Sequence, residues 1–230
     1  MPPRLSVVIP VFNERATVLE LIGRVQAVPI EKEIIVVDDG STDGTRALLE
    51  ELARSGAVCV FFQDRNRGKG AALRRGFREA RGDFVLMQDA DLEYDPQDYP
   101  RLLEPLERGA ADVVYGSRFL GPPAPGRRAW HTAGNRALTA FSNFLTGLRL
   151  TDVWTCYKVF RRDLLLELDL REDRFGFEPE VTARLARRRA RLVEVPIGYC
   201  GRSFAEGKKI GPRDLFNGLW ATLRYSLFRG

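Results

Sequence analysis

Short apolar runs alternate with helical patterns along the first ninety residues of the chain. The runs that predict buried strands are residues 5–9, 33–37, 58–63 and 84–87. Each is rich in apolar or β-branched residues and is bounded by Pro, Gly or Asp, as is typical of buried strands. Helices are expected between them, at about 14–27, 43–54 and 71–80. This alternation predicts βαβ crossovers and a mostly parallel sheet flanked by helices, an α/β fold.

The second half continues the pattern with longer interruptions. Residues 112–118 and 193–197 are expected to form strands, residues 129–146 a long helix, and residues 175–180 the start of a further helix. We expect one domain over residues 1–210, followed by a C-terminal amphipathic helix within 211–230. Apolar residues recur at helical spacing over 215–228. Two interpretations stay open: a helix packed on the core or across a dimer, or an interfacial helix beside a membrane.

Composition narrows the class of protein. No run of about 18 apolar residues is present, so no transmembrane helix is expected, and the first strand leaves no room for a signal peptide. The 3 cysteines are widely spaced and odd in number, which indicates free thiols in a reducing compartment. We therefore expect a cytoplasmic protein, either free or peripheral on the cytoplasmic face of a membrane. Cysteine spacing of the metal-binding kind is lacking.

Charge points to an anionic partner. The net charge is +5, and the basic residues concentrate in the later part of the chain. Phosphate, nucleic acid or an acidic membrane would each suit a basic half. The basic residues are dispersed over several elements, without a motif that reads RNA or DNA, so nucleic acid is not the expected partner. The arginines at 184–191 are expected to be solvated surface charges.

Candidate site residues follow the ends of the first four predicted strands. Asp89 and Asp91 come directly after residues 84–87. The candidates near the ends of the other three strands are Pro10, Glu14, Asp38, Asp39 and Lys69. In parallel sheets, ligands sit at the carboxyl ends of the strands, so these residues should converge on one edge. Two carboxylates at such an edge suit Mg²⁺ or Mn²⁺ bridging to phosphate oxygens. A solvated acidic turn is the alternative for this pair taken alone.

Four of these segments together resemble a known family. They are Val8-Ile-Pro-Val-Phe-Asn-Glu14, Val37-Asp-Asp-Gly-Ser-Thr-Asp-Gly44, Asn66-Arg-Gly-Lys-Gly70 and Asp89-Ala-Asp91. In order and spacing they resemble family 2 glycosyltransferases of the GT-A fold, and within that family the dolichol/polyprenyl-phosphate sugar synthases. Gly116-Ser-Arg118, the segment 152–161 and the segment 202–209 extend the resemblance, which covers about residues 5–215.

The resemblance implies an inverting, metal-dependent transfer of a hexose from a nucleotide sugar, GDP-mannose or a UDP-hexose, to a polyprenyl or dolichyl phosphate. It implies Mg²⁺ or Mn²⁺ on Asp89 and Asp91, with Glu93 as a further ligand. The residues it implies for donor binding are Pro10, Glu14, Asp38, Asp39, Lys69, Asp89 and Arg136. Those it implies for the acceptor phosphate are Arg118, Arg136 and Arg202, and the catalytic set is Asp89, Asp91, Asp152, Arg118 and Arg202.

Two other functions remain in competition with this one. The same fold could act on a saccharide or other hydroxyl acceptor, which needs a carboxylate base, and Asp152 and Glu178 are the candidates. A lipid phosphate is already ionised and needs no strong base. The second competitor, of another class, is a non-catalytic nucleotide-binding module at a membrane. The base, the sugar, the lipid length and the oligomeric state are not predicted. His131 is expected on a helix surface.

Overall fold

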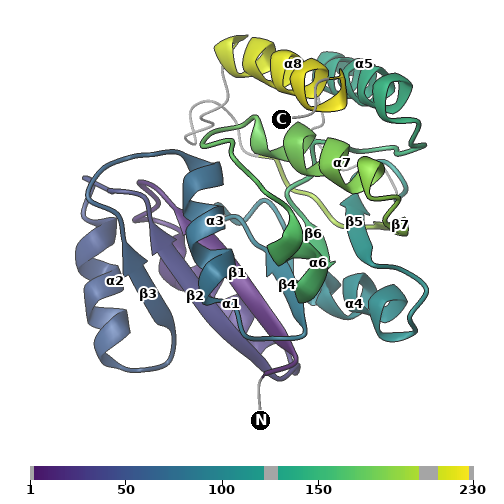
Figure 1. Cartoon of the computed structure of the whole chain (residues 1–230). Helices are drawn as coiled ribbons and strands as arrows, with labels where there is room; N and C mark the ends of the chain where they lie inside the picture. The colour runs from purple at the N-terminus through teal and green to yellow at the C-terminus, as the bar shows by residue number, and fades with distance from the viewer. Residues whose placement is uncertain (1–2, 122–128, 202–211, 228–230) are drawn as a thin grey trace.

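A seven-stranded mixed sheet forms the centre of the protein (Figure 1). The computed structural model describes residues 3–121, 129–201 and 212–227. Strand order is β3-β2-β1-β4-β6-β5-β7, and β6 runs antiparallel to both of its neighbours while the other pairs are parallel. The strands are β1 (Leu5–Val11), β2 (Lys32–Asp38), β3 (Cys59–Phe62), β4 (Phe84–Met87), β5 (Val113–Ser117), β6 (Lys158–Arg161) and β7 (Leu192–Pro196).

Helices cover both faces of this sheet, which explains why its central strands are continuously apolar. The helices are α1 (Val18–Ala27), α2 (Thr45–Arg54), α3 (Lys69–Glu79), α4 (Tyr99–Glu107), α5 (Ala129–Thr146), α6 (Arg162–Glu167), α7 (Phe177–Arg187) and α8 (Pro212–Leu227), with a 3₁₀ turn at Pro96–Asp98. Helices α1, α2 and α4 pack against one face, and α3, α6 and α7 against the other.

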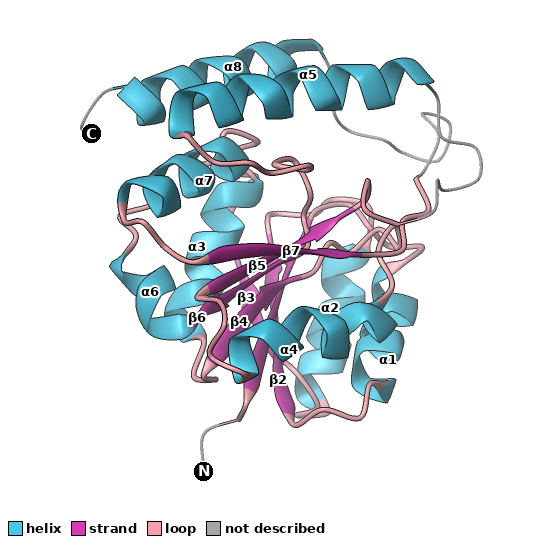
Figure 2. Ribbon diagram, turned by 90° about the vertical axis from the view of Figure 1, so that its right-hand side faces the viewer, coloured by secondary structure: helices cyan, strands magenta, loops and turns pink. Residues whose placement is uncertain are grey.

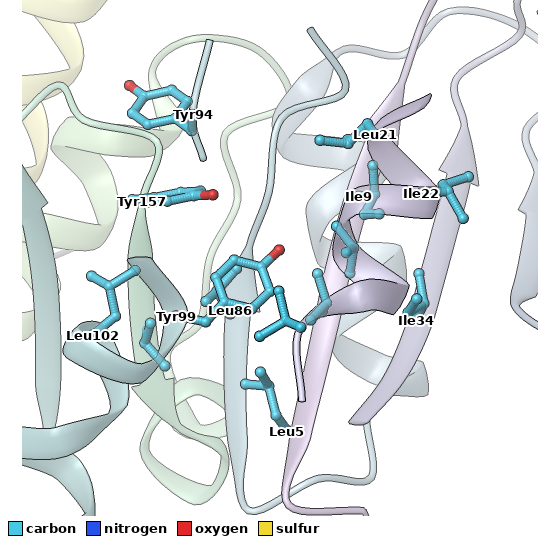
Figure 3. Packing of buried hydrophobic residues seen from close by; sticks show 14 of the residues in the cluster. Leu5, Ile9, Leu21, Ile22, Ile34, Leu86, Tyr94, Tyr99, Leu102 and Tyr157 are labelled. Atoms are coloured by element: carbon cyan, nitrogen blue, oxygen red, sulfur yellow. The ribbon is translucent and has the colours of Figure 1, made fainter. Parts of the chain in front are cut away.

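Alternation along β1 divides the core into two clusters. Leu5 and Ile9 point into the first cluster, beside Leu21 of α1 and Leu86 of β4 (Figure 3). Val8 points to the opposite face, because successive side chains of a strand alternate. There Gly76 of α3 lies so close that a Cβ atom would come within 2.3 Å of Val8 Cγ1. This close approach holds α3, and Lys69 at its start, firmly against the sheet.

The long helix α5 and the C-terminal helix α8 lie side by side in an outer layer (Figure 2). Ala221 and Tyr225 of α8 are buried with Ala183 of α7, so one side of α8 packs on the domain. Trp220 is 60% exposed and Phe144 of α5 is 85% exposed. None of the helices in the described ranges combines the length and apolar character needed to cross a membrane.

Most of the predicted elements are confirmed, and the mixed, mainly parallel sheet is as expected. Three elements were not predicted: α4, β6 and α6. Strand β6 was not predicted because only two apolar residues, Val159 and Phe160, lie between its charged ends. Helix α4 contains Pro105 and begins beside Pro100, both of which weaken a helical pattern. The division at residue 210 stays a prediction.

Candidate active site

The carboxyl ends of β1, β2, β4 and β5 meet at one edge of the sheet and carry the predicted site residues there. Because β6 is antiparallel, its amino end with Lys158 reaches the same edge. The edge holds many buried charged side chains: Glu14, Asp38, Asp39, Asp152, Lys158 and Glu178. Burying ionised groups is costly, so their concentration here marks a candidate functional site.

The two aspartates after β2 have different surroundings. Asp39 Oδ1 and Oδ2 accept the backbone N–H groups of Arg67 and Gly68, each at 2.8 Å, so this carboxylate fixes the turn before α3. Burial raises the pKa of Asp39 in spite of these two hydrogen bonds. Asp38 is fully buried, and its Oδ2 has no hydrogen-bond partner among the described residues; Arg46 Nη1 lies 3.8 Å away. Asp38 is therefore the one of the pair with an oxygen available to a ligand.

The first loop and β1 are held near this pair. Glu14 Oε2 accepts the hydroxyl of Thr17 at 3.0 Å, and the Glu14 backbone N–H donates to Thr45 Oγ1 at 3.0 Å. Pro10 pairs with Val37 in the sheet, one position before Asp38. Pro10 and Glu14 thus lie where the sequence placed them, at the edge shared with Asp38, and their contacts to a donor stay predictions.

Asp89 is held by a lysine from the start of α3. Lys69 Nζ lies 2.8 Å from Asp89 Oδ1 and 3.1 Å from Oδ2, and both side chains are largely buried. Although burial opposes the charged forms, the Asp89 carboxylate raises the pKa of Lys69, and the Lys69 ammonium lowers the pKa of Asp89. A cation thus already sits against this carboxylate. Lys69 and Asp89 therefore lie at the same edge, as expected, while a contact between Lys69 and the donor stays a prediction.

Asp91 and Glu93 occupy the turn that follows. Asp91 Oδ1 accepts the backbone N–H of Glu93 at 3.2 Å, and Leu92 between them has a positive φ of 61°. Glu93 Oε2 accepts the hydroxyl of Tyr199 at 2.8 Å. Within the described ranges, no three His, Cys, Asp or Glu side chains are grouped to hold a metal. A cation on Asp89 and Asp91 would complete its coordination with water or phosphate oxygens, as Mg²⁺ commonly does.

Arg118 and Asp152 form a buried bidentate pair. Arg118 Nε donates to Asp152 Oδ2 at 2.7 Å and Nη2 donates to Oδ1 at 2.9 Å, while the Arg118 backbone N–H also donates to Oδ2. Asp152 is fully buried, and the backbone N–H groups of Thr151 and Asp152 are fixed by Glu194. Both oxygens of Asp152 are therefore engaged. This arrangement makes Asp152 a positioning residue for Arg118, which weighs against the hypothesis that it acts as a base.

Arg136 of α5 lies near this pair. Its guanidinium stacks over the ring of Phe119, 5.5 Å from the ring centre, and Phe119 directly follows Arg118. Arg136 also lines a hollow of about 250 Å³ together with Phe119, Thr139, Ala140, Asn143, Leu150 and Thr151. Arg202 and the whole segment 202–209 lie outside the described residues, as does the side chain of His131.

Residues beneath the edge were missed in the sequence. Cys156 Sγ lies 2.9 Å from Lys69 Nζ, and buried Lys158 donates to the carbonyl oxygens of Val153 and Thr155. The pattern that could have indicated Lys158 is its place directly before the apolar pair of the short strand 158–161. The prediction that arginines 184–191 are solvated was wrong for Arg184, whose side chain is 11% exposed and pairs with Glu180. Arg187 to Arg189 and Arg191 are exposed, as expected.

Comparison with known proteins agrees with this geometry. The family model described as glycosyl transferase family 2 matches residues 6–169. Polyprenol monophosphomannose synthase of Mycolicibacterium smegmatis is 34% identical over 90% of this chain and 82% of its own length. Undecaprenyl-phosphate mannosyltransferase of Micrococcus luteus is 34% identical over 90% of this chain and 88% of its own. Glucosyl-3-phosphoglycerate synthase of Mycobacterium tuberculosis, crystallised with Mn²⁺ and UDP, has a TM-score of 0.75 at 22% identity, covering 99% of this chain and 81% of that one. The chain has the GT-A fold, belongs to glycosyl transferase family 2 and is a glycosyltransferase.

Proposed function

We propose that the protein transfers a hexose from a nucleotide sugar to a polyprenyl phosphate, with Mg²⁺ or Mn²⁺ as cofactor. The observation that carries this proposal is the Arg118–Asp152 pair. A guanidinium held by a buried carboxylate at the end of β5 is pre-oriented to donate hydrogen bonds to phosphate oxygens. Relatives named for polyprenol and undecaprenyl-phosphate mannosyl transfer support the same acceptor class.

The state of the candidate bases favours a phosphate over a hydroxyl acceptor. A hydroxyl acceptor needs a carboxylate with an oxygen free to take a proton. Asp152 uses both oxygens on Arg118. Glu178 keeps Oε2 without a hydrogen-bond partner among the described residues, but it is 3% exposed and its Oε1 lies 3.4 Å from Lys69 Nζ, so its burial opposes contact with an acceptor hydroxyl. A phosphate acceptor is already ionised and can attack without either of them. We infer an in-line displacement that inverts the anomeric centre.

The donor would lie along the edge from β1 to β4. Asp38 offers the nucleoside a buried oxygen that has no hydrogen-bond partner among the described residues, and Lys69 offers an ammonium near the diphosphate. Asp89 and Asp91 supply the hard carboxylate oxygens that Mg²⁺ and Mn²⁺ prefer, and the cation beside Asp89 fits such a site. A bound divalent cation offsets the charge that grows on the departing diphosphate. Glu93, Arg136 and Arg202 keep the roles that the resemblance implies.

A lipid acceptor places the enzyme at a membrane surface, and we assign the contact to the outer layer of α5 and α8 (Figure 2). Phe144, Trp220 and Leu227 are 85%, 60% and 58% exposed there. Exposed aromatic and apolar side chains on surface helices are the groups that enter the interfacial region of a bilayer. The proposal is peripheral contact on the cytoplasmic face, beside the acceptor phosphate.

The test starts with thermal unfolding of the purified protein with GDP-mannose, UDP-glucose or UDP-GlcNAc, each with and without Mn²⁺. We expect one donor to raise the midpoint temperature of unfolding, and to do so only when Mn²⁺ is present. Transfer from that donor is then measured to a polyprenyl phosphate and to the matching polyprenol. Product with the phosphate and none with the alcohol is the expected result. Transfer to the alcohol at a comparable rate would establish a hydroxyl acceptor, and no shift with any donor would favour a non-catalytic module.

A further inference from the structure

A buried ammonium lies between two carboxylates beneath the active-site edge. Lys69 Nζ contacts both oxygens of Asp89, at 2.8 and 3.1 Å, and lies 3.4 Å from Glu178 Oε1. The three side chains are 14%, 18% and 4% exposed. Lys69 is therefore closely bonded to Asp89 and only loosely paired with Glu178.

Glu178 has an oxygen that can accept a further hydrogen bond. Its Oε2 is buried and has no hydrogen-bond partner in the part of the chain that the structure describes. A buried acceptor without a donor is unfavourable, so this oxygen is a ready partner for a nearby cation. Glu178 belongs to the first turn of α7, where the helix dipole favours a negative charge. The carboxylate thus keeps an unfilled acceptor next to an ammonium that binds mainly to Asp89.

A divalent cation on Asp89 would change this arrangement. It would occupy the same carboxylate as the ammonium, and two cations a few ångströms apart in a poorly solvated site repel strongly. Lysine carries its charge on a flexible four-carbon stem, so the ammonium can move while its backbone stays fixed in α3. Glu178 Oε2 is the unfilled acceptor beside it among the described residues.

We propose that Lys69 is an internal cation that holds Asp89 before metal binds, and that Glu178 receives the ammonium when a divalent cation takes its place. This inference rests on the metal-dependent function proposed above. It makes Glu178 a positioning residue that acts through Lys69. Without the ammonium, Asp89 and Glu178 would lose the cation that lies beside both of them, so the exchange keeps a positive charge next to each carboxylate in both states.

The exchange predicts that Lys69 competes with metal. In Lys69→Met, which keeps the side-chain length and removes the charge, we expect Mn²⁺ to bind about tenfold more tightly in the absence of any nucleotide, because a charge-assisted hydrogen bond no longer has to break. Free Mn²⁺ is measured by electron paramagnetic resonance. Binding that is equal or weaker in the variant would overturn the proposal and make Lys69 a simple support for Asp89.

A double-mutant cycle separates Glu178 from a general electrostatic effect. Glu178→Gln should weaken Mn²⁺ binding several-fold in the wild-type background, because the displaced ammonium loses its receiver, and much less in the Lys69→Met background. An equal loss in both backgrounds would contradict the exchange. Thermal unfolding checks that each variant is folded.

Nuclear magnetic resonance provides a readout on the wild-type protein. The chain has five lysines, so selective ¹³C labelling resolves their Cε signals. Mg²⁺ should shift the Lys69 signal and leave that of Lys158 in place; an unmoved Lys69 signal at saturating Mg²⁺ would overturn the proposal. Absence of any Mg²⁺ or Mn²⁺ binding would remove the metal-dependent function itself, and this inference with it.

Discussion

Charged residues lie at both ends of the sheet, but in opposite surroundings. At the carboxyl end, Asp38, Asp152 and Lys158 are fully buried. At the amino end, a hollow of about 620 Å³ is lined by arginines and acids that include Arg81, Asp112, Arg161, Glu167 and Arg188. The charged pairs there are mostly exposed, as with Arg188 and Glu167 at 42% and 63%.

The contrast teaches that the larger hollow is not the better site. Exposed pairs such as Arg188–Glu167 gain little, because water already solvates both partners. Buried groups such as Asp38 and Glu178 keep an oxygen without a hydrogen-bond partner among the described residues, at an energetic cost. Buried carboxylates kept in this way indicate the end of the sheet where ligands bind, and in open α/β sheets ligands bind at the carboxyl ends of the strands.

The largest effect is expected from Asp91→Ala. If Asp91 holds the metal as proposed, its removal should lower metal-dependent turnover by about 10²–10³-fold or more, because charge on the departing diphosphate is no longer offset. Turnover at saturating Mn²⁺ is the measurement, with thermal unfolding as the control for the fold. Activity close to that of the wild type would remove Asp91 from the metal site.

A second prediction concerns the cost of burying Lys158. Burial lowers its pKa to about 8, from an ordinary value of 10.5. Below pH 8 the lysine is protonated in both states, and the buried charge destabilises the fold. Between about pH 8 and 10.5 only the unfolded chain holds the proton, so the contribution of Lys158 to stability rises with pH, by up to about 3 kcal/mol.

Urea unfolding at several pH values checks this contribution in the wild type and in Lys158→Met. The difference between the two proteins isolates Lys158 from the other groups that titrate in the same range. The free energy of unfolding of the wild type should increase relative to that of the variant as the pH rises from 7 to 10. A constant difference would mean that burial does not lower the pKa of Lys158. It would weaken the contrast between the two ends of the sheet.

How far the sequence could predict this site depends on the kind of residue. Asp89, Asp91 and Arg118 follow directly after apolar strands, so pattern and the topology of parallel sheets place them at one edge. Their partners come from distant segments: Asp152 lies 34 positions from Arg118, and Cys156 lies 87 positions from Lys69. No local pattern encodes such pairs, because they arise only when β6 enters between β4 and β5.

The burial of individual side chains could not be predicted from the sequence either. Arg184 and Arg187 stand in one run of arginines, yet Arg184 is 11% exposed because α8 covers its side of α7, where its guanidinium stacks on Tyr225. The two aspartates after β2 were predicted together, and only the fold shows that Asp39 is engaged by the turn while Asp38 keeps an oxygen available. Local sequence predicts which residues reach the edge, and packing decides which of them can act.

The third prediction tests whether Asp152 orients Arg118 or removes a proton. Asp152→Asn should raise the apparent KM for the acceptor about tenfold, since Arg118 loses its charged partner, and should change kcat less. Loss of a general base would instead lower kcat by about 10²–10⁴-fold and remove the corresponding limb of the pH profile. Steady-state kinetics at several pH values distinguish these results.

The smallest effect is expected at the amino end of the sheet, from Arg191→Ala. Arg191 makes the same bidentate contact with Asp112 that Arg118 makes with Asp152, but its side chain is 55% exposed. Water already solvates both partners of an exposed pair, so the free energy of unfolding should fall only slightly, with turnover unchanged. Asp152→Asn in the same urea series is the matched control and should lose more stability, because its pair is buried. Equal losses in the two variants would show that burial does not separate the two ends, and a fall in turnover in Arg191→Ala would bring the amino-end hollow into the function of the enzyme.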